Sequence, residues 1–473
     1  MESEIKKPSF SYALAMLIVV AAIIAVGLLV FGAPIQILML IGIIALIPFM
    51  KGLGFSYQKI EKSMITSMSK ALQPGLILLI VGILIGAWIA AGTVPTLIYY
   101  GIQAISPQFF LVTTLLFCSI VSLATGTSWG TIGTAGLAMM GIGASLNIPV
   151  GVTAGAIISG AYFGDKMSPL SDSTNLAPAV TGGDLISHIK HMVWTTLPAY
   201  IITAIIFTFI GLKYGHQSID AENVNTLTNY LSEHFHLGII PLIPVAVLFL
   251  LLILKQPAVP SIFIGSMVGA LIALFYQGVG FVDMLNILYS GYHVQSGIDM
   301  VDSLLQRGGL TSMLELIALF LFALGIGGML SEAGVLEALI ASFANRIKHT
   351  GWLVFATIIC TYATLAIGGA VYFSTVMTGT LMKPIFDKLN LKPENLSRIL
   401  EDAGTQSAAL IPWTGSGLFT AAALGVSPLV YIPFCFLAQM TPLVSLFYGI
   451  TGITMKEKEK VRKRKTSTKV AEA

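Results

Sequence analysis

The segment GDKMSPLSDSTNLAP, Gly164 to Pro178, interrupts one of the many apolar runs in this chain. It places two aspartates, four hydroxyl side chains and an asparagine within a few residues. Pro169 prevents a continuous helix, because proline lacks an N–H and clashes with the preceding turn. Polar backbone at membrane depth is tolerated only where protein buries it or where it lines a wet cavity. The segment therefore predicts a broken membrane helix beside a cavity, with a solvated loop between two spans as the alternative.

The whole chain is far more apolar than a soluble protein. Of its 473 residues, 56% are hydrophobic and 10% are charged, and the mean hydropathy is +0.88. Apolar runs of about 20 residues recur along it, each able to cross about 30 Å of hydrocarbon. We therefore expect an all-α polytopic membrane protein with about ten to thirteen membrane segments. The first run, Tyr12 to Phe31, is expected to be a span rather than a targeting segment.

The chain also matches itself at a constant offset of 242 residues. After a slip of one residue, Pro169 matches Pro412. Several glycines, a cysteine and a proline recur in register, which argues against coincidence, although glycine is common wherever helices pack closely in lipid. The matched residues are Gly86, Gly92, Cys118 and Gly126 with Gly328, Gly334, Cys360 and Gly368.

Matching loops of the two copies carry opposite charge, as expected if the second copy is inverted in the membrane. Residues 51–70 carry four lysines, whereas residues 293–312 carry Asp299 and Asp302 against a single arginine. We therefore predict two inverted-topology repeats, with both termini in the cytoplasm. Two further pairs agree: the uncharged turn 101–108 with 343–350 (Arg346 and Lys348), and the acidic loop 213–237 (Asp220, Glu222 and Glu233) with the basic tail after Met455.

These features divide the chain into five parts. They are 1–74, N-terminal spans and a cytoplasmic loop; 75–212, the first repeat with the ion-site motif; 213–312, a linker with additional spans; 313–455, the second repeat; and 456–473, a basic cytoplasmic tail.

A second glycine-rich break, ATGTSWGTIGTAG (Ala124 to Gly136), predicts a hairpin tip or an unwound helix, with a small-residue packing face as the alternative. In the second copy, IPWTGSG (Ile411 to Gly417) takes the place of SPLSDST. Asp172 then falls opposite Gly415. The backbone break is kept in both halves, whereas the negative charge is kept in one.

Carboxylates and hydroxyls are the hard oxygen ligands that small cations prefer. Burial destabilises an ionised aspartate, so a proton can compete with Na+ for the same oxygens. We therefore predict exchange at a membrane-embedded aspartate, foremost Asp172, without covalent catalysis, cofactor or resident metal. The expected ion-binding residues are Asp172, Asp165, Ser171, Ser173, Thr174, Asn175, Thr127, Ser128, Thr414 and Ser416.

For the other charged residues the sequence leaves more than one role open or predicts only a position. Lys166 is either the ion-pair partner of Asp165 in a loop or a cationic element of the transport cycle. Glu315 is either a second protonatable group or an interfacial one. Two more sets complete the expectations: Glu401 and Asp402 near the cavity, and Asp184, His188 and His191 at the membrane surface.

At Gly164 to Pro178, together with GTSWGT (Gly126 to Thr131), the sequence resembles the NhaC family of bacterial sodium/proton antiporters. The resemblance implies a multi-pass protein of the bacterial cell membrane, with a re-entrant hairpin and a broken helix in each repeat. It also implies Na+ and H+ as the transported partners. Because the family includes sodium-lactate/malate-proton exchangers, coupled exchange of a small carboxylate is the alternative function.

Two other classes fit less well. An intramembrane aspartyl protease needs aspartates on two facing helices, whereas Asp165 and Asp172 share one irregular stretch. A channel would require a repeated ring of subunits around a pore, which nothing in the sequence suggests. We expect lipid but no nucleic acid as a partner, with a homodimer as the oligomer to test.

Overall fold

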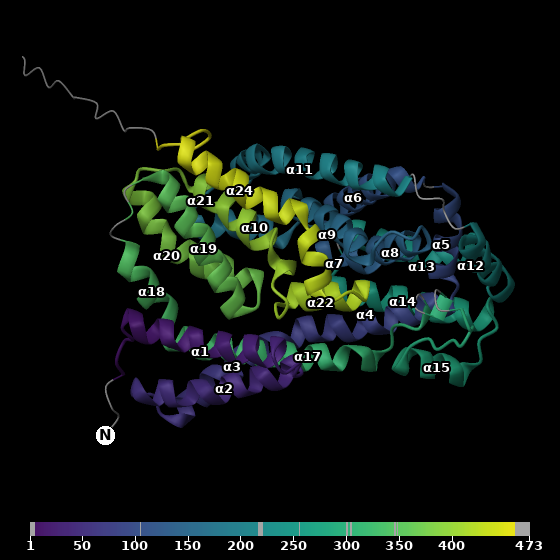
Figure 1. Ribbon diagram of the computed structural model, residues 1–473, viewed down its shortest axis with the longest axis horizontal. Helices are drawn as coiled ribbons and strands as arrows, with labels where there is room; N and C mark the ends of the chain where they lie inside the picture. The colour runs from purple at the N-terminus through teal and green to yellow at the C-terminus, as the bar shows by residue number, and fades with distance from the viewer. Residues whose placement is uncertain are drawn as a thin grey trace, which may run out of the picture.

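The computed structural model describes residues 5–104, 106–215, 221–254, 256–298, 301–302, 305–344, 347 and 349–458. Within these residues the chain is helical, with turns between the helices (Figure 1). The expected all-α class is confirmed. Four charged residues used in the loop comparison, and most of the basic tail, lie outside the described residues: Asp220, Asp299, Arg346 and Lys348.

Among the described residues, seven apolar helices are long enough to cross a membrane, or eight if the bent pair Gly415–Leu424 and Pro428–Phe434 forms one span. The expected ten to thirteen segments also counted shorter and broken pieces, which the structure contains. The long spans are α1 (Phe10–Leu29), α2 (Ile35–Gly52), α3 (Tyr57–Met68) continuing into α4 (Leu72–Ala90), α6 (Pro107–Thr125), α11 (Leu185–Gly215), α17 (Leu314–Glu332) and α19 (Thr350–Gly368). Shorter helices are α5 (Thr93–Ala104), α12 (Ala221–His234), α13 (Ile243–Ile253), α14 (Ala258–Phe275), α15 (Phe281–Ser290), α18 (Val335–Ala344), α23 (Pro428–Tyr431) and α24 (Phe436–Thr451).

Helices of the two expected repeats agree in order and length. α4 and α17 each have 19 residues, as do α6 and α19. Further along, α10 (Asp172–Thr181) and α22 (Gly415–Leu424) each have 10 residues. This agreement is consistent with the duplication that the sequence predicts.

One detail of the register differs from the constant offset. Gly126 ends α6 with φ +71, and the glycine that ends α19 in the same way is Gly369, with φ +63. The offset matched Gly126 to Gly368 instead. A helix that ends in the left-handed conformation favours glycine, because a Cβ is strained there. The one-residue shift between the two repeats therefore occurs before the ends of α6 and α19. It does not occur between these helix ends and the two prolines, Pro169 and Pro412.

Two helical hairpins enter the molecule from opposite ends (Figure 1). The first joins α6 to α7 (Ser128–Thr131), a π-helical turn (Ile132–Gly136) and α8 (Leu137–Ser145). The second joins α19 to α20 (Val371–Lys388). In this view α6 and α8 lie toward the right and α19 and α20 toward the left. The opposed hairpins are consistent with inverted repeats.

Each half also contains an interrupted helix. In the first, α9 (Val150–Met167) stops, and α10 begins at Asp172. In the second, α21 (Pro393–Leu400) passes into a π-helical turn (Glu401–Thr405) and α22 begins at Gly415. Pro169 and Pro412 lie in the two interruptions, where they prevent the helix from continuing. The broken helix predicted at Gly164 to Pro178 is present.

The predicted cytoplasmic loop at 51–70 is wrong, because most of it is helix. Only residues 53–56 separate α2 from α3. Ile60 is buried, whereas Lys59 is exposed and lies 3.4 Å from the carboxylate of Glu332. Lys59 and Lys62 lie on the exposed face of α3, so they lower the mean hydropathy of a segment that is nevertheless helical.

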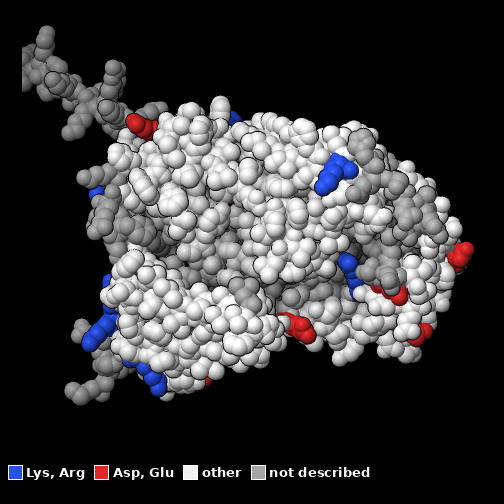
Figure 2. All heavy atoms as spheres, viewed as in Figure 1, with Lys and Arg blue, Asp and Glu red and all other residues white. Residues whose placement is uncertain are grey.

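Charged side chains gather at the two ends of the molecule. In Figure 2 most of the visible Lys and Arg side chains lie toward the left end, and most of the Asp and Glu side chains lie toward the right. The start of α1 and the last described residues lie at the left end (Figure 1). An excess of basic residues is typical of the cytoplasmic side of a membrane protein.

Candidate ion-binding site

The hairpin tips and helix interruptions meet at one cavity of about 1090 Å³. Both tips line it, through Gly126–Thr127 and Gly369–Ala370. The first interruption contributes Pro169–Ser171, and the start of α22 contributes Gly415. Residues of α17 form another part of the wall. Figure 2 shows this face of the molecule hollowed between the block that contains α19 and α20 and the block that contains α1 to α3.

Asp165, near the end of α9, places its carboxylate at this cavity. Its Oδ2 accepts a hydrogen bond from the Ser128 hydroxyl at 2.6 Å, and its Oδ1 accepts one from the Ser171 hydroxyl at 2.5 Å. Ser128 begins α7 and Ser171 immediately precedes α10. The hairpin tip and the helix interruption therefore each supply one oxygen beside one carboxylate. This set of hard oxygens suits a small cation.

Other predicted ligands hold these serines in place. The Thr127 hydroxyl caps α7 by accepting from the Gly130 N–H at 3.2 Å. Thr174 donates to the carbonyl oxygens of Asp165 and Lys166, at 3.1 and 2.9 Å. These carbonyls lie in the last turn of α9, which has no further turn to satisfy them. The hydroxyls of Thr127 and Thr174 therefore stabilise helix ends.

Asn175 and Ser173 also lie beside the first interruption. The Asn175 amide donates to the carbonyl oxygens of Pro169 and Ser171, at 2.9 and 2.7 Å. The Ser173 and Ser171 hydroxyls are 3.1 Å apart. Asn175 therefore fixes the backbone of the interruption. The Ser173 hydroxyl lies next to the Ser171 hydroxyl, which in turn contacts the Asp165 carboxylate.

Asp172, the aspartate that the sequence favoured, lies in a more open position. It is the first residue of α10 and is exposed, although it lines the same cavity. The Tyr372 hydroxyl donates to its Oδ2 at 3.5 Å. Tyr372 belongs to the opposite hairpin, so this contact joins the two halves across the cavity. Asp172 thus faces the solvent-accessible part of the cavity, and Asp165 is held more tightly behind it.

The second half supplies few oxygens to the cavity. The Thr414 hydroxyl caps α22 by accepting from the Gly417 N–H at 3.0 Å. Ser416 accepts from the Trp129 indole N–H at 3.4 Å. At Gly415, which matches Asp172, a Cβ would lie 3.0 Å from the Phe320 ring. Packing against Phe320 therefore disfavours a second carboxylate at this point.

A buried ion cluster behind the cavity joins the two halves and was not predicted. The Lys166 ammonium pairs with the Asp402 carboxylate, and both side chains are fully buried. Thr195 donates to Asp402 at 3.0 Å, and the Arg398 guanidinium lies 3.8 Å from it. Of the two alternatives for Lys166, the loop ion pair with Asp165 is therefore wrong. The partner of Lys166 is distant in sequence, so no local pattern could reveal it.

Two histidines expected at the membrane surface are buried. The His188 ring lies 2.7 Å from the Ser397 hydroxyl, and the His191 ring lies 3.2 Å from Arg398. They therefore join α11 to α21. Glu315 is exposed in the first turn of α17. Among the described residues, no three His, Cys, Asp or Glu side chains come close enough to hold a metal ion.

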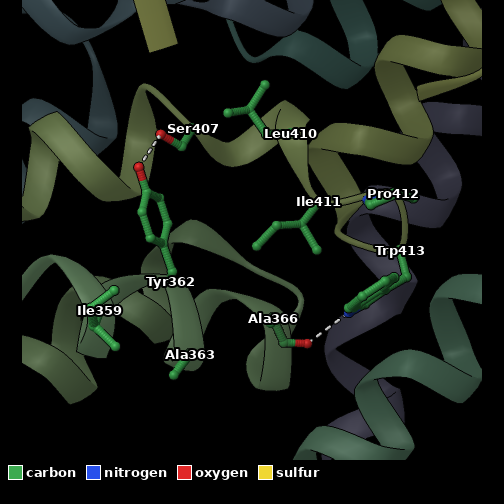
Figure 3. A pocket seen from close by; sticks show the side chains of 9 residues that line it. All are labelled: Ile359, Tyr362, Ala363, Ala366, Ser407, Leu410, Ile411, Pro412 and Trp413. Atoms are coloured by element: carbon green, nitrogen blue, oxygen red, sulfur yellow. Dashed lines mark hydrogen bonds between the residues drawn. The ribbon is translucent and has the colours of Figure 1, made fainter. Parts of the chain in front are cut away.

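A smaller pocket of about 480 Å³ lies beside the second interruption (Figure 3). The Trp413 indole N–H donates to the carbonyl of Ala366 at 2.8 Å, which ties the interruption to α19. The Tyr362 and Ser407 hydroxyls are 3.3 Å apart on another wall. Its lining residues are otherwise apolar and none is charged, so this pocket does not suit an ion.

Known proteins resemble this chain over most of its length. A model of the Na+/H+ antiporter family matches residues 160–453. The chain is 42% identical to the malate-2H+/Na+-lactate antiporter of Bacillus subtilis, over 85% of this chain and 86% of that protein. It is 37% identical to the Na+/H+ antiporter NhaC of Alkalihalophilus pseudofirmus, over 97% and 99%. It is 34% identical to the arginine/ornithine antiporter ArcD of Halobacterium salinarum, over 96% and 94%.

The family match and the relatives are all antiporters, which agrees with the apolar helices described above. They also confirm the resemblance that the motif at Gly164 to Pro178 carries. The chain belongs to the Na+/H+ antiporter family, and it is a multi-pass membrane transporter of the NhaC type rather than an enzyme.

Proposed function

We propose that this protein exchanges Na+ for H+ and that the two ions compete for the carboxylate of Asp165. The observation that carries the proposal is the pair of serine hydroxyls that meet this carboxylate, one from a hairpin tip and one from a helix interruption. Any movement of the hairpin tip relative to the helix interruption therefore changes how the Ser128 and Ser171 hydroxyls surround the Asp165 carboxylate. Ion occupancy and conformational change are thereby coupled.

Competition follows from the cost of a buried charge. An ionised carboxylate that loses access to water must be neutralised, either by a cation or by a proton. With Na+ bound, the hydroxyl oxygens of Ser128 and Ser171 face the cation and their protons point away. With a proton on Asp165, the acid hydrogen-bonds to the same serines. If only these two neutral forms pass through the occluded state, each Na+ that leaves is replaced by a proton.

Asp172 serves a different purpose in this proposal. Its exposed carboxylate lines the cavity in front of Asp165, where it raises the local concentration of cations. It remains the aspartate that the sequence alone favoured, so the two must be compared directly.

The test uses proteoliposomes that contain a pH-sensitive dye and are challenged with Na+. We expect Asp165→Asn to abolish Na+-dependent proton movement. Asp172→Asn should retain it with a higher KM for Na+. The reverse result, with transport lost in Asp172→Asn and retained in Asp165→Asn, would move the site to Asp172.

A second candidate function is coupled exchange of a small carboxylate. The observation in its favour is Lys70, which lines the cavity within the long apolar segment Tyr57–Ala90. Its ammonium lies 5.8 Å from the centre of the Phe373 ring. A cation beside the cavity can bind an organic anion, and the cavity is much larger than a bare Na+ requires. The relative from Bacillus subtilis is described as carrying malate and lactate.

Adding malate or lactate to the same vesicles separates the two functions. If a carboxylate is carried, it should stimulate Na+-dependent proton movement in the parent protein, and Lys70→Gln should remove the stimulation. No stimulation by either acid would leave plain Na+/H+ exchange.

We further propose a location in the bacterial plasma membrane with both termini in the cytoplasm, since the start of α1 and the last described residues lie at the basic end of the molecule. Cysteines introduced as Lys458→Cys and Glu233→Cys, in a variant without native cysteines, test this orientation. An impermeant maleimide added to intact cells should label position 233 and spare position 458. The homodimer stays a prediction.

A further inference from the structure

Glu401 is a buried carboxylate that the proposed exchange at Asp165 does not use. Its side chain is fully buried, and neither of its oxygens has a hydrogen-bond partner. A buried polar group without a partner is costly, and an ionised one is far more so. The structure therefore calls for a function, or a bound ion, that accounts for this carboxylate.

The backbone around Glu401 is also unusual. Residues Glu401–Thr405 form a π-helical turn, in which the N–H of Gln406 donates to the carbonyl of Glu401 at 3.1 Å. Such turns are rare in proteins as a whole, and those that do occur are often found at functional sites. The Thr405 hydroxyl and both amide atoms of Gln406 are likewise buried without partners. With Oδ2 of Asp402, six buried polar atoms without a hydrogen-bond partner lie between Glu401 and Gln406.

The charges around Glu401 leave it without a cation of its own. Lys166 is the nearby cation, and it is already paired with Asp402. Arg398 also lies on the Asp402 side, 3.8 Å from that carboxylate. The groups that act electrostatically on Glu401, or on which Glu401 acts, are Asp165 and Lys166 of α9, Tyr372 of α20 and Asp402 of the turn itself. The elements packed against the turn also carry other titratable and charged groups, among them Tyr162 of α9, Asp172 of α10, His188 and His191 of α11, Tyr362 of α19, Glu394 and Arg398 of α21 and Tyr448 of α24.

A short route connects Glu401 with water. Thr405, four residues further along the turn, lines the central cavity. Its hydroxyl can both accept and donate a proton. Thr405 is therefore a residue of this turn that both lines the cavity and interacts with Glu401.

We propose that Glu401 is a second proton-binding site, which holds one proton in this conformation and exchanges it with the cavity through Thr405. On release, the proton leaves a carboxyl oxygen of Glu401 for cavity water, and the resulting carboxylate shares Lys166 with Asp402. The inference rests on the proposed exchange at Asp165 and adds one proton to it. Each Na+ is then exchanged for two protons, and transport moves net charge.

The test measures the ratio of H+ to Na+ at equilibrium in proteoliposomes, with the membrane potential clamped at zero by K+ and valinomycin. For a given pH gradient, the Na+ gradient that stops net flux gives the ratio as a slope on logarithmic axes. We expect a slope of about two for the parent protein and about one for Glu401→Gln, because the amide cannot take up the proton. Glu394→Gln, on the same helix but near its start, is the matched control and should keep a slope of about two.

The outcomes separate this inference from the proposed function. If the parent protein shows no Na+-dependent proton movement, the proposed exchange itself fails. If it exchanges the ions with a slope of about one, exchange stands and the second site is overturned. A slope of about two that Glu401→Gln leaves unchanged would also overturn the assignment to Glu401. If Glu401→Gln does not fold, the slope measured for the parent protein still tests whether a second proton is exchanged.

Discussion

Asp165 and Lys166 are neighbours in sequence, yet their side chains serve different parts of the molecule. Asp165 faces the cavity and its serines, whereas Lys166 faces the second half and pairs with Asp402. Adjacent residues on a helix point about 100° apart, which allows this division. The ion site and the buried ion cluster are thus held by one turn of α9.

The buried cluster predicts unequal effects of removing its members. Asp402→Asn leaves both Lys166 and Arg398 without a carboxylate, at a cost of about 3–5 kcal/mol. Lys166→Met should cost less, because Asp402 keeps Arg398 and Thr195 nearby. Thermal unfolding in detergent should therefore give a lower Tm for Asp402→Asn than for Lys166→Met. Equal Tm values would contradict the shared role of Asp402.

At this scale the sequence predicted the segment where carboxylates and hydroxyls gather, and it favoured Asp172 over Asp165; which of the two binds the ion stays a prediction. Pro169 marked the interruption, and the surrounding carboxylates and hydroxyls marked the candidate site. The sequence did not reveal that α9 extends to Met167, which places Asp165 inside the helix and Asp172 at the exposed start of the next one. Nor could it reveal Asp402 as the partner of Lys166, because that contact depends on how the two halves pack.

Among the elements, the first hairpin tip depends on Gly126. Its φ is +71, and an added Cβ would lie 2.8 Å from the Cβ of Leu170, next to Ser171. Gly182 ends α10 with φ +81 but has open space around it, which makes it a matched control. Both Ala variants should lose about 1 kcal/mol of stability from backbone strain.

Only Gly126→Ala should also impair Na+ transport, because it alone displaces the interruption that carries Ser171. Flux in proteoliposomes, normalised to folded protein, checks this difference. Equal flux in the two variants would contradict the role of the tip in shaping the ion site.

The start of α11 gives a prediction about pH. The backbone N–H of Ser187 donates to the Asp184 carboxylate at 2.9 Å and holds the pKa of that carboxyl below its usual value. A lowered pKa means that the cap stabilises the folded protein above the usual pKa of aspartate. The stabilisation is lost as the pH falls through the lowered value.

Asp184→Asn can still cap the helix but does not titrate in this range. The Tm of the parent protein should therefore fall more steeply at acidic pH than that of Asp184→Asn. Parallel curves would show that this cap makes no pH-dependent contribution.

Element predictions from the sequence succeeded where proline and glycine decide the backbone. They failed at 51–70, where lysines on the exposed face of α3 gave a helix the hydropathy of a loop. They also missed the π-helical turn at Glu401, which has no distinctive composition. Its unpartnered carboxylate becomes visible only when the surrounding helices are in place.

Over the whole molecule, two hairpins and two interrupted helices from opposite halves surround one cavity, and only the first half supplies a carboxylate with two serine hydroxyls to it. A duplicated scaffold can move symmetrically between two sides of a membrane. In the proposed exchange, Na+ and H+ take turns at the carboxylate of Asp165. The proposed exchange therefore depends on the arrangement as a whole, and Asp165 is the residue at which the proposal can be tested.

The most direct test is the KM for Na+ in the parent protein as the pH on the Na+ side is lowered. If H+ and Na+ compete for Asp165, the KM should rise by about tenfold per pH unit once the pH is below the pKa of the free site, while the maximal rate at saturating Na+ is preserved. A KM that stays constant while the maximal rate falls would contradict competition at a shared carboxylate.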